Sequence, residues 1–467
     1  MAAIEPSAHR DLDLLVIGAG AAGSTVAFEA AAKGARVALA ERWKVGGTCL
    51  NAGCDPTKTL VRSAEVLHLA RTAERFGISV PAAAAEWPAV RARVAGVIDA
   101  IRGGDGDRNV RDAGIDLVKA HARFHSPHEI EADGRLLRAE KVVVAVGARA
   151  MVPEVPGLRE AGFVTNVEAV DLPDLPRRLA VVGGGVVAVE FAQIFARFGV
   201  EVTLLARGPL LRGEEPELVA ALTEALRREG VRIEIGVRPE RVERLGGTKL
   251  LRGRRGPELI VCEADEILLA TGRVPALEDL GLDAAGIAHS AQGIVVDAGM
   301  KTSQPHVWAV GDAVAGGLPF THVADYQARV VVHNALSDER PQEAVYDGVP
   351  WAIFTDPELG HVGHTEADAR AAGFEVKTAV VPIRGLARAV TSDEPDGMVK
   401  LVAERTTGRL LGGHVLSARG GELLGEIALA VRLKLPAEAI AHTLHAYPTF
   451  SEGVFWTAFE LAKPDGG

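Results

Sequence analysis

Residues Leu14–Gly23 read LLVIGAGAAG, a short apolar run that leads directly into three closely spaced glycines. An Ala-rich helical stretch follows, and a second apolar run then ends in Glu41. In such a strand–turn–helix–strand unit Gly18 permits the tight turn, Gly20 lets the backbone approach a pyrophosphate, and Gly23 allows helix–strand packing. Glu41 stands where an acid would hold ribose hydroxyls. These residues predict a dinucleotide site at the edge of a parallel sheet.

The same pattern recurs in LAVVGGGVVAVE, which predicts a second dinucleotide site with small residues at Gly183, Gly185 and Ala188. At the end of its second strand stands Arg207, where an NADH-selective site would place an acid, and Arg212 follows. A guanidinium can pair with a 2′-phosphate through two hydrogen bonds, so the two arginines favour NADPH. The alternative is that they are solvated arginines in a loop.

Two cysteines lie close together shortly after the first unit, in the segment GGTCLNAGCDPTK that contains Cys49 and Cys54. The third, Cys262, falls in an apolar run and is expected in the core. Three cysteines exclude a secreted framework held by several disulfides, and the close pair is expected to be catalytic or metal-binding. The alternative is that both thiols merely pack in the interior.

Length and composition set the broad class. With 467 residues the chain should divide into about three domains, and 48% hydrophobic and 24% charged residues are globular values. No apolar run reaches the length of a membrane span, and the first ten residues show no secretory signal. The net charge of -11 argues against nucleic acid as a partner. We therefore expect a cytoplasmic protein without membrane or nucleic-acid partners.

Together these motifs resemble the flavin-dependent pyridine nucleotide-disulfide oxidoreductases, the family of lipoamide dehydrogenase, glutathione reductase and mercuric reductase. The resemblance extends from about Asp11 to about Glu460. It implies an α/β fold with two doubly wound Rossmann-like nucleotide-binding domains and a C-terminal α+β dimerisation domain. It also implies FAD at the first site, NADPH at the second, and a redox-active disulfide in which Cys54 faces the flavin and Cys49 meets the substrate.

The resemblance also places the domain boundaries, because two strands ending in small-residue turns, at Gly147 and Gly272, look like the crossovers between the nucleotide domains. The expected parts are the FAD-binding domain at 1–152, the NAD(P)H-binding domain at 153–271, a return to the FAD-binding domain at 272–346, and the C-terminal dimerisation domain at 347–467.

Further cofactor residues follow from the resemblance. In WAVGDA, Asp312 would bond the ribityl chain of the flavin, and Lys58 would pair with Glu190 beside the ring. Read without the family, Lys58 and Glu190 are ordinary charges on helix surfaces. The expected FAD residues are Gly18, Gly20, Gly23, Glu41, Gly47, Thr48, Lys58, Gly147, Gly311 and Asp312. The expected NADPH residues are Gly183, Gly185, Ala188, Glu190, Arg207, Arg212 and Gly272.

The segment HAYPTFSE near the C-terminus resembles the one that completes the partner's active site in a homodimer. Tyr447 occupies the place where thiol-disulfide members carry a histidine oriented by the acid at the Glu452 position. A phenol, with an ordinary pKa near 10, cannot exchange protons at neutral pH as imidazole does. Tyrosine here is familiar from mercuric reductases. Their second, C-terminal thiol pair has no counterpart, because Cys262 is the last cysteine.

We therefore expect a homodimeric NADPH-dependent flavoenzyme that passes electrons to a non-thiol acceptor: a soft metal ion such as mercuric or cupric ion, a quinone or another oxidant. The expected catalytic residues are Cys49, Cys54, Lys58, Glu190, Tyr447 and Glu452. One alternative is dihydrolipoyl dehydrogenase or another disulfide reductase that uses His445 with Glu452. Others are a quinone reductase with idle cysteines and a non-catalytic redox sensor.

Three residues depart from the family pattern. Asp55 follows the second cysteine, where relatives keep an apolar residue; it is expected to cap a helix, with exposure to solvent or repulsion of the Cys54 thiolate as alternatives. His361 and His364 are expected to be structural or surface residues, because the local sequence reads as a strand. A copper or zinc site is the alternative, although no bound metal is predicted.

Overall fold

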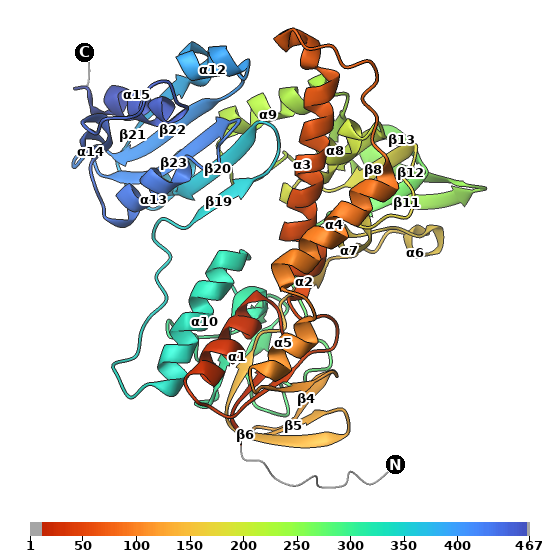
Figure 1. The fold of residues 1–467 in the computed structure, drawn as a ribbon, viewed down its shortest axis with the longest axis vertical. Coiled ribbons are helices and arrows are strands. Elements are labelled where there is room, and N and C mark those ends of the chain that lie inside the picture. Colours follow the sequence, from red (N-terminus) through yellow and green to blue (C-terminus); the bar gives the residue numbers. More distant parts are fainter. Residues whose placement is uncertain (1–11, 465–467) are drawn as a thin grey trace.

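The computed structural model describes residues 12–464. It contains two nucleotide-binding units and a C-terminal domain, and Figure 1 shows the helices α3 (Cys54–Arg71) and α4 (Trp87–Arg102) rising from the first unit toward the second. In the described part of the chain, no helix has both the length and the apolarity needed to cross a membrane.

The first unit is built on a sheet of order β3-β2-β1-β6-β5-β4, with β18 added beside β6. Its parallel strands are β1 (Leu12–Ile17), β2 (Val37–Ala40), β3 (Asp116–Val118), β6 (Arg135–Val144) and β18 (Val307–Ala309); β4 (Ala122–Ser126) and β5 (Glu129–Ala132) are antiparallel. The helices α1 (Ala21–Ala32), α5 (Gly106–Asp112) and α10 (Thr321–Leu336) belong to this unit (Figure 1). Because β18 follows the whole second unit in the sequence, the chain returns to its first sheet.

The second unit repeats this plan in a parallel sheet of order β10-β9-β8-β14. Its elements are β8 (Arg178–Val182), α8 (Val186–Arg197), β9 (Glu201–Ala206), α9 (Pro216–Arg228), β10 (Arg232–Ile235) and β14 (Glu266–Leu269). An antiparallel sheet accompanies it, formed by β11 (Arg238–Leu245), β12 (Thr248–Arg255) and β13 (Glu258–Ala264). The two crossover segments pair as β7 (Ala148–Ala150) with β15 (Arg273–Pro275).

The C-terminal domain is an antiparallel sheet of order β19-β20-β23-β22-β21 with helices packed against it. Its strands are β19 (Pro350–Ile353), β20 (Glu358–Gly363), β21 (Val376–Pro382), β22 (Met398–Glu404) and β23 (Leu410–Ser417). Its helices are α11 (Glu366–Ala371), α12 (Ala387–Ser392), α13 (Leu424–Arg432), α14 (Ala437–Ala441) and α15 (Ser451–Ala462). The α/β class expected from the sequence, with two Rossmann-like units and an α+β dimerisation domain, is confirmed.

The smaller elements connect these parts. They are α2 (Gly47–Ala52), α6 (Leu158–Ala161), α7 (Asn166–Ala169), β16 (His289–Ser290) and β17 (Gly293–Ile294), with 3-10 turns η1 (Ala73–Phe76), η2 (Gly311–Ala313) and η3 (Ile383–Gly385).

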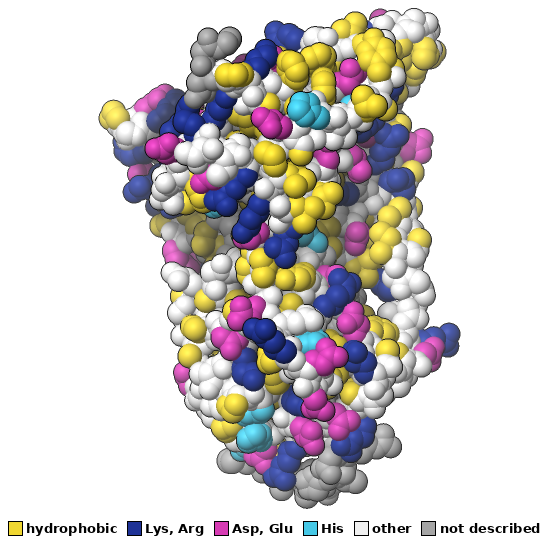
Figure 2. Space-filling view, turned by 90° about the vertical axis from the view of Figure 1, so that its left-hand side faces the viewer, with side chains coloured by type: hydrophobic (Ala, Val, Ile, Leu, Met, Phe, Trp, Pro, Cys, Tyr) yellow, Lys and Arg dark blue, Asp and Glu magenta, His cyan; other side chains and the backbone are white. Residues whose placement is uncertain are grey.

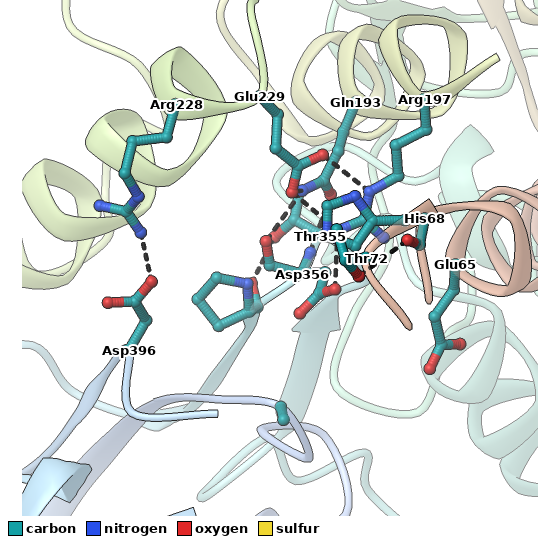
Figure 3. Close-up of polar contacts among 12 residues, drawn as sticks. Glu65, His68, Thr72, Gln193, Arg197, Arg228, Glu229, Thr355, Asp356 and Asp396 are labelled. Carbon is teal, nitrogen blue, oxygen red and sulfur yellow. Dashed lines mark hydrogen bonds and ion pairs between the residues drawn. The ribbon is translucent and has the colours of Figure 1, made fainter. Parts of the chain in front are cut away.

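Polar contacts join the second unit to the C-terminal domain. Figure 3 shows buried Arg197 on α8 between two carboxylates, at 2.7 Å from Glu229 and 2.7 Å from Asp356. Gln193 donates to the carbonyl of Asp356, and Arg228 pairs with Asp396 on the loop before β22. These residues line a cavity of about 440 Å³ between the two parts. The C-terminal domain is therefore held against the second unit by the ion pair of buried Arg197 with Asp356 and by an exposed ion pair of Arg228 with Asp396.

Candidate active site

The cysteine segment is held against the first dinucleotide loop. The amide of Gly46 donates to the carbonyl of Ala19 at 2.8 Å, and a Cβ on Gly47 would lie 2.6 Å from the Cα of Gly20. Thr48 and Cys49 follow in α2, and α3 begins at Cys54. Cys49 therefore lies in a helix that starts directly beside the loop predicted to carry the flavin pyrophosphate, and Cys54 begins the next helix.

A single hydroxyl connects the two thiols. Cys49 and Cys54 are free, half-buried cysteines, as in the reduced form of a disulfide pair. The Oγ1 atom of Thr321, the first residue of α10, lies 3.2 Å from Sγ of Cys49 and 3.3 Å from Sγ of Cys54. Three chemically active groups from two remote parts of the sequence therefore converge at one point.

The two thiols differ in acidity. A hydrogen bond from Cys49 lowers the pKa of Cys54 to about 6, assisted by the Thr321 hydroxyl and the charge of Lys58 and opposed by burial and by Asp55. The pKa of Cys49 is raised, because its proton is held by the Cys54 sulfur and because the thiol is buried. At neutral pH the pair therefore carries one thiolate, on Cys54, and one thiol, on Cys49.

Lys58 and Glu190, expected to pair, are in contact. The Lys58 ammonium on α3 lies 2.8 Å from Oε2 of Glu190 on α8, and the Glu190 side chain is only 3% exposed. Glu190 also accepts a hydrogen bond from the backbone amide of Phe354, whose ring lies under the Lys58 ammonium. The pair links the cysteine helix to the helix of the second dinucleotide unit.

Asp55 does not cap the helix, so the favoured expectation is wrong. Because α3 begins at Cys54, Asp55 lies inside its first turn and Gly53 takes the capping position. No hydrogen bond to the Asp55 carboxylate occurs within residues 12–464. Burial raises the pKa of Asp55, and its charge opposes ionisation of Cys54, as the alternative interpretation expected.

The first dinucleotide loop has the geometry that a bound pyrophosphate requires. Gly18 has φ +100°, and a Cβ on Gly23 would lie 1.8 Å from the Gly18 carbonyl oxygen. A Cβ on Gly20 would meet no atom within 4 Å, so the backbone before α1 is accessible to a ligand. Glu41 is 7% exposed and accepts hydrogen bonds from the amides of Ala19 and Trp43. These residues fit the diphosphate and ribose of FAD.

Asp312, expected on the ribityl chain, pairs with an arginine. Its Oδ2 lies 2.9 Å from Nη1 of Arg273, which belongs to the second crossover strand β15. The neighbouring amide of Gly311 donates to Oε1 of Gln327 on α10. Gly47, Gly147, Gly272 and Gly311 all have positive φ. The carboxylate therefore lies where the two nucleotide units meet, and its contact with flavin stays a prediction.

The second dinucleotide loop repeats the geometry of the first. Gly183 has φ +143°, its Cβ would lie 2.1 Å from a carbonyl oxygen, and Gly185 faces open space. Ala188 is fully buried in α8. Arg207 and Arg212 are exposed after β9, and neither forms an ion pair with any residue between 12 and 464. Both guanidinium groups are therefore free to meet an anionic ligand.

The C-terminal motif presents Tyr447 outward. The Tyr447 side chain is 76% exposed, and Oε2 of Glu452 accepts from the amide of Thr449 rather than from an imidazole. His445 points elsewhere: its Nε2 lies 3.0 Å from Oε2 of Glu426 on α13. Within the described residues Glu452 and His445 are therefore not bonded to each other, and the alternative in which they act together stays a prediction.

The remaining singled-out residues separate into core and surface. Cys262 is buried in the core of the second unit, as expected. His361 is 2% exposed on strand β20, whereas His364 follows the strand and is exposed. The two histidines therefore do not converge, and a metal site made from this pair is wrong.

Sequence reasoning missed Thr321 and Arg273. Thr321 begins a helix in the return segment, far from the cysteines, and its only signal is a position near the flavin motif. Arg273 directly follows Gly272 in a crossover motif that was noted for its small residues. Both contacts depend on how the return segment packs against the first unit.

Comparisons with known proteins place these features in a family context. A family model described as pyridine nucleotide-disulphide oxidoreductase matches residues 12–328, and the model of its dimerisation domain matches residues 349–458. The mercuric reductase of Staphylococcus aureus is 34% identical over 456 residues, which cover 97% of this chain and 83% of that protein. The dihydrolipoyl dehydrogenase of Thermus scotoductus is 35% identical over 457 residues, covering 97% of each chain.

A solved structure is similar over nearly the whole length. The HOCl-induced flavoprotein disulfide reductase RclA from Escherichia coli, in a Cu(II) complex, has a TM-score of 0.86 and 29% sequence identity. The match covers 96% of this chain and 100% of that chain.

Proposed function

Because the chain belongs to the pyridine nucleotide-disulphide oxidoreductases, we propose that it passes electrons from NADPH through FAD to Cys49 and Cys54 and on to a non-thiol acceptor. The protein is an NAD(P)H-dependent FAD oxidoreductase, and its dimerisation domain makes it a homodimer. When bound, FAD accepts a hydride from nicotinamide and hands the electron pair to sulfur.

The cysteines store the electron pair. At neutral pH one NADPH converts the Cys49–Cys54 disulfide into the Cys54 thiolate, the Cys49 thiol and NADP⁺. A divalent mercuric ion bound by both sulfurs displaces the one remaining proton, from Cys49; its reduction to the metal consumes two electrons and restores the disulfide. The Cys54 pKa of about 6 supplies a thiolate for the first bond to the metal at neutral pH.

The observation that carries this proposal is the place of Tyr447. Reduction of a disulfide substrate needs a proton donor for the leaving thiol, and imidazole serves this purpose in thiol-disulfide members. Here the segment presents an exposed phenol, and His445 is engaged by Glu426. A metal ion needs no proton when it is reduced, and a quinone has no leaving thiolate and takes its two protons from the Cys49 thiol and from solvent, so an acceptor of this kind suits the site.

The surface of the C-terminal domain supports a site shared between two subunits. Figure 2 shows hydrophobic side chains over this side of the molecule. The exposed large apolar residues among the described residues of this domain are Val380, Val390, Leu429, Leu433, Leu444, Tyr447, Trp456 and Phe459. Leu444 is 99% exposed, three positions before Tyr447. A partner that covers this surface would receive the Tyr447 segment beside its own cysteines.

An acceptor panel tests the proposal. NADPH oxidation by the FAD-loaded enzyme is measured with mercuric ion, cupric ion, menadione, lipoamide and glutathione disulfide. We expect turnover with a metal ion or the quinone to exceed disulfide turnover by at least tenfold. Faster turnover of a disulfide would refute the proposal.

Cysteine variants separate the electron routes. Cys49→Ser should abolish metal turnover, whereas Cys262→Ser, a matched change of the core cysteine of β13, should preserve it. Full metal and quinone turnover in Cys49→Ser would show that electrons leave directly from the flavin. That result would contradict the proposed relay and support a quinone reductase with idle cysteines.

A further inference from the structure

Three side chains from separate elements converge away from the cysteines. Glu214 precedes α9, while His361 on β20 and His414 on β23 are directly paired across neighbouring strands. One ligand atom from each of the three lies within 4.8 Å of the other two. His361 is 2% exposed and His414 is 0% exposed. The cluster therefore has the composition and burial of a small metal site.

The hydrogen bonds of the two rings define which nitrogens are free. Nε2 of His361 lies 2.8 Å from the carbonyl oxygen of Gly363, and Nε2 of His414 lies 3.1 Å from that of His364. A carbonyl only accepts, so both Nε2 atoms carry the proton, and in a neutral ring Nδ1 then presents a lone pair. Histidines that bind metals typically donate their other ring N–H to such a carbonyl or carboxylate.

One ring nitrogen lacks a partner, and the other faces a carboxylate. Nδ1 of His361 lies 2.7 Å from Oε2 of Glu214, a contact that needs either a proton on Nδ1 or a bound cation. Nδ1 of His414 is buried and has no hydrogen-bond partner among the described residues. An unpaired buried nitrogen is costly, which calls for an unseen ligand. A metal ion would satisfy all three groups at once.

We propose that Glu214, His361 and His414 bind one divalent transition-metal ion of the zinc type through two Nδ1 atoms and one carboxylate oxygen. Imidazole with carboxylate suits zinc and copper. A tetrahedral ion with bonds of about 2.0–2.1 Å holds its donors roughly 3.3 Å apart. That spacing falls within the range of the cluster, so small side-chain shifts complete the site.

The surrounding charge favours a cation. The buried Lys400 ammonium lies 2.7 Å from Glu215, 2.7 Å from Glu217 and 3.0 Å from Glu366. Arg370 also pairs with Glu366. Together with Glu214, four carboxylates therefore face two cationic side chains.

A tryptophan ring packs against the three proposed ligands, and the ligands come from two different parts of the fold. The Trp351 ring stacks on His361 with centroids 3.6 Å apart, and its Nε1 donates to Oε1 of Glu214 at 2.8 Å. Glu214 belongs to the second nucleotide unit and both histidines to the C-terminal sheet. The bound ion would therefore tie these two parts together, independently of the cysteine chemistry.

Zinc binding by the oxidised, FAD-loaded enzyme tests the site, because a disulfide leaves the Cys49 and Cys54 sulfurs unavailable as thiolate ligands. After chelator treatment, calorimetry should give one Zn²⁺ per subunit and a higher melting temperature. Glu214→Gln and His414→Ala should weaken binding by at least tenfold. Glu214→Gln retains a side-chain oxygen that accepts the hydrogen bond from Trp351. It therefore tests zinc binding in a folded protein even if His414→Ala fails to fold.

Matched controls distinguish this site from the thiols. His364→Ala, which changes an exposed ring next to β20, should bind Zn²⁺ as the wild type does. The Cys49→Ser/Cys54→Ser variant should also bind fully, and Co²⁺ in it should show visible bands without sulfur-to-metal charge transfer. Absence of binding at millimolar Zn²⁺, unchanged binding in Glu214→Gln, or loss of binding in the cysteine variant would overturn the proposal.

Discussion

The Nζ atom of Lys58 lies 2.8 Å from Oε2 and 3.0 Å from Oε1 of Glu190, although 132 positions separate the two residues. Glu190 is almost fully buried, whereas Lys58 remains one-third exposed. The contact connects α3, which begins with Cys54, to α8, which follows the second dinucleotide loop. It therefore joins the helix that begins with Cys54 to the helix of the second dinucleotide unit.

Replacing Lys58 should destabilise the fold. Lys58→Met leaves the Glu190 carboxylate buried with only the amide of Phe354 as partner. We expect the free energy of unfolding to fall by about 2 kcal/mol, below the usual cost for a fully buried pair because Lys58 is partly exposed. Urea unfolding measures this change. Lys33→Met on the surface after α1 is the control, and an equal loss in both variants would contradict the account.

The hydroxyl of Thr321 should set the acidity of Cys54. Donation from this hydroxyl stabilises the thiolate, so Thr321→Val should raise the pKa of Cys54 above its value of about 6. The pH dependence of iodoacetamide alkylation, resolved by mass spectrometry, measures the shift, which we expect to be about 1 unit. Thr321→Ser keeps the hydroxyl and should titrate like the wild type. An unchanged pKa of Cys54 in Thr321→Val would show that the Thr321 hydroxyl does not stabilise the thiolate.

Arg207 and Arg212 should determine the choice of nicotinamide cofactor. Removing both guanidinium groups eliminates pairing with a 2′-phosphate but leaves NADH binding intact. We expect the double variant Arg207→Ala/Arg212→Ala to lose about tenfold to a hundredfold in kcat/KM for NADPH, with little change for NADH. Arg238→Ala, an exposed arginine of the same unit, serves as control. Equal losses for both cofactors would refute the assignment.

Stability should depend on pH through Glu358. Burial raises the pKa of this carboxyl to about 7, against an ordinary value of 4.5. The folded protein therefore holds a proton that the unfolded chain releases, and its stability falls as the pH rises from about 4.5 through 7. Glu358→Gln should remove this fall, gaining up to about 3 kcal/mol on the wild type between pH 5 and pH 8.

Thermal or urea unfolding at the two pH values tests the effect of Glu358. Glu438→Gln, on the exposed side of α14, should leave the pH profile unchanged. A Glu358→Gln profile parallel to that of the wild type would show that another group causes the pH dependence.

A histidine at position 447 should add disulfide turnover. Tyr447→His places an imidazole five residues before Glu452, where thiol-disulfide relatives carry their acid–base pair. General acid catalysis contributes about a hundredfold or more, so lipoamide turnover should rise by at least tenfold while metal turnover stays similar. Tyr447→Phe, which lacks any titratable group, should gain nothing. A similar rise in lipoamide turnover in Tyr447→Phe would show that the missing imidazole is not the reason for the acceptor preference.

Much of the fold could be predicted from local sequence. The loops at Gly18 and Gly183 predict two parallel-sheet units, because the backbone geometry at these positions tolerates only glycine. The contact between Lys58 and Glu190 was also expected, since each stands beside a motif whose position in the fold is fixed. These elements were predictable because short, contiguous sequences encode them.

The contacts that the sequence did not predict depend on tertiary packing. Thr321 reaches both thiols only because α10 packs beside α1, which no local pattern reveals. His361 meets His414 through the register of β20 and β23, so the sequence neighbour His364 was the wrong candidate. Asp55 was expected to cap a helix, but α3 already begins at Cys54 and Gly53 takes the capping position.

The central claim, that the electron pair passes through Cys49 and Cys54, is tested most directly by differential alkylation. Free thiols of the FAD-loaded enzyme are blocked first, NADPH is added without oxygen, and newly formed thiols receive an isotopically heavy label read by mass spectrometry. The account predicts heavy label at Cys49 and Cys54 and none at buried Cys262. Bleaching of the flavin by NADPH without heavy label at either Cys49 or Cys54 would contradict it.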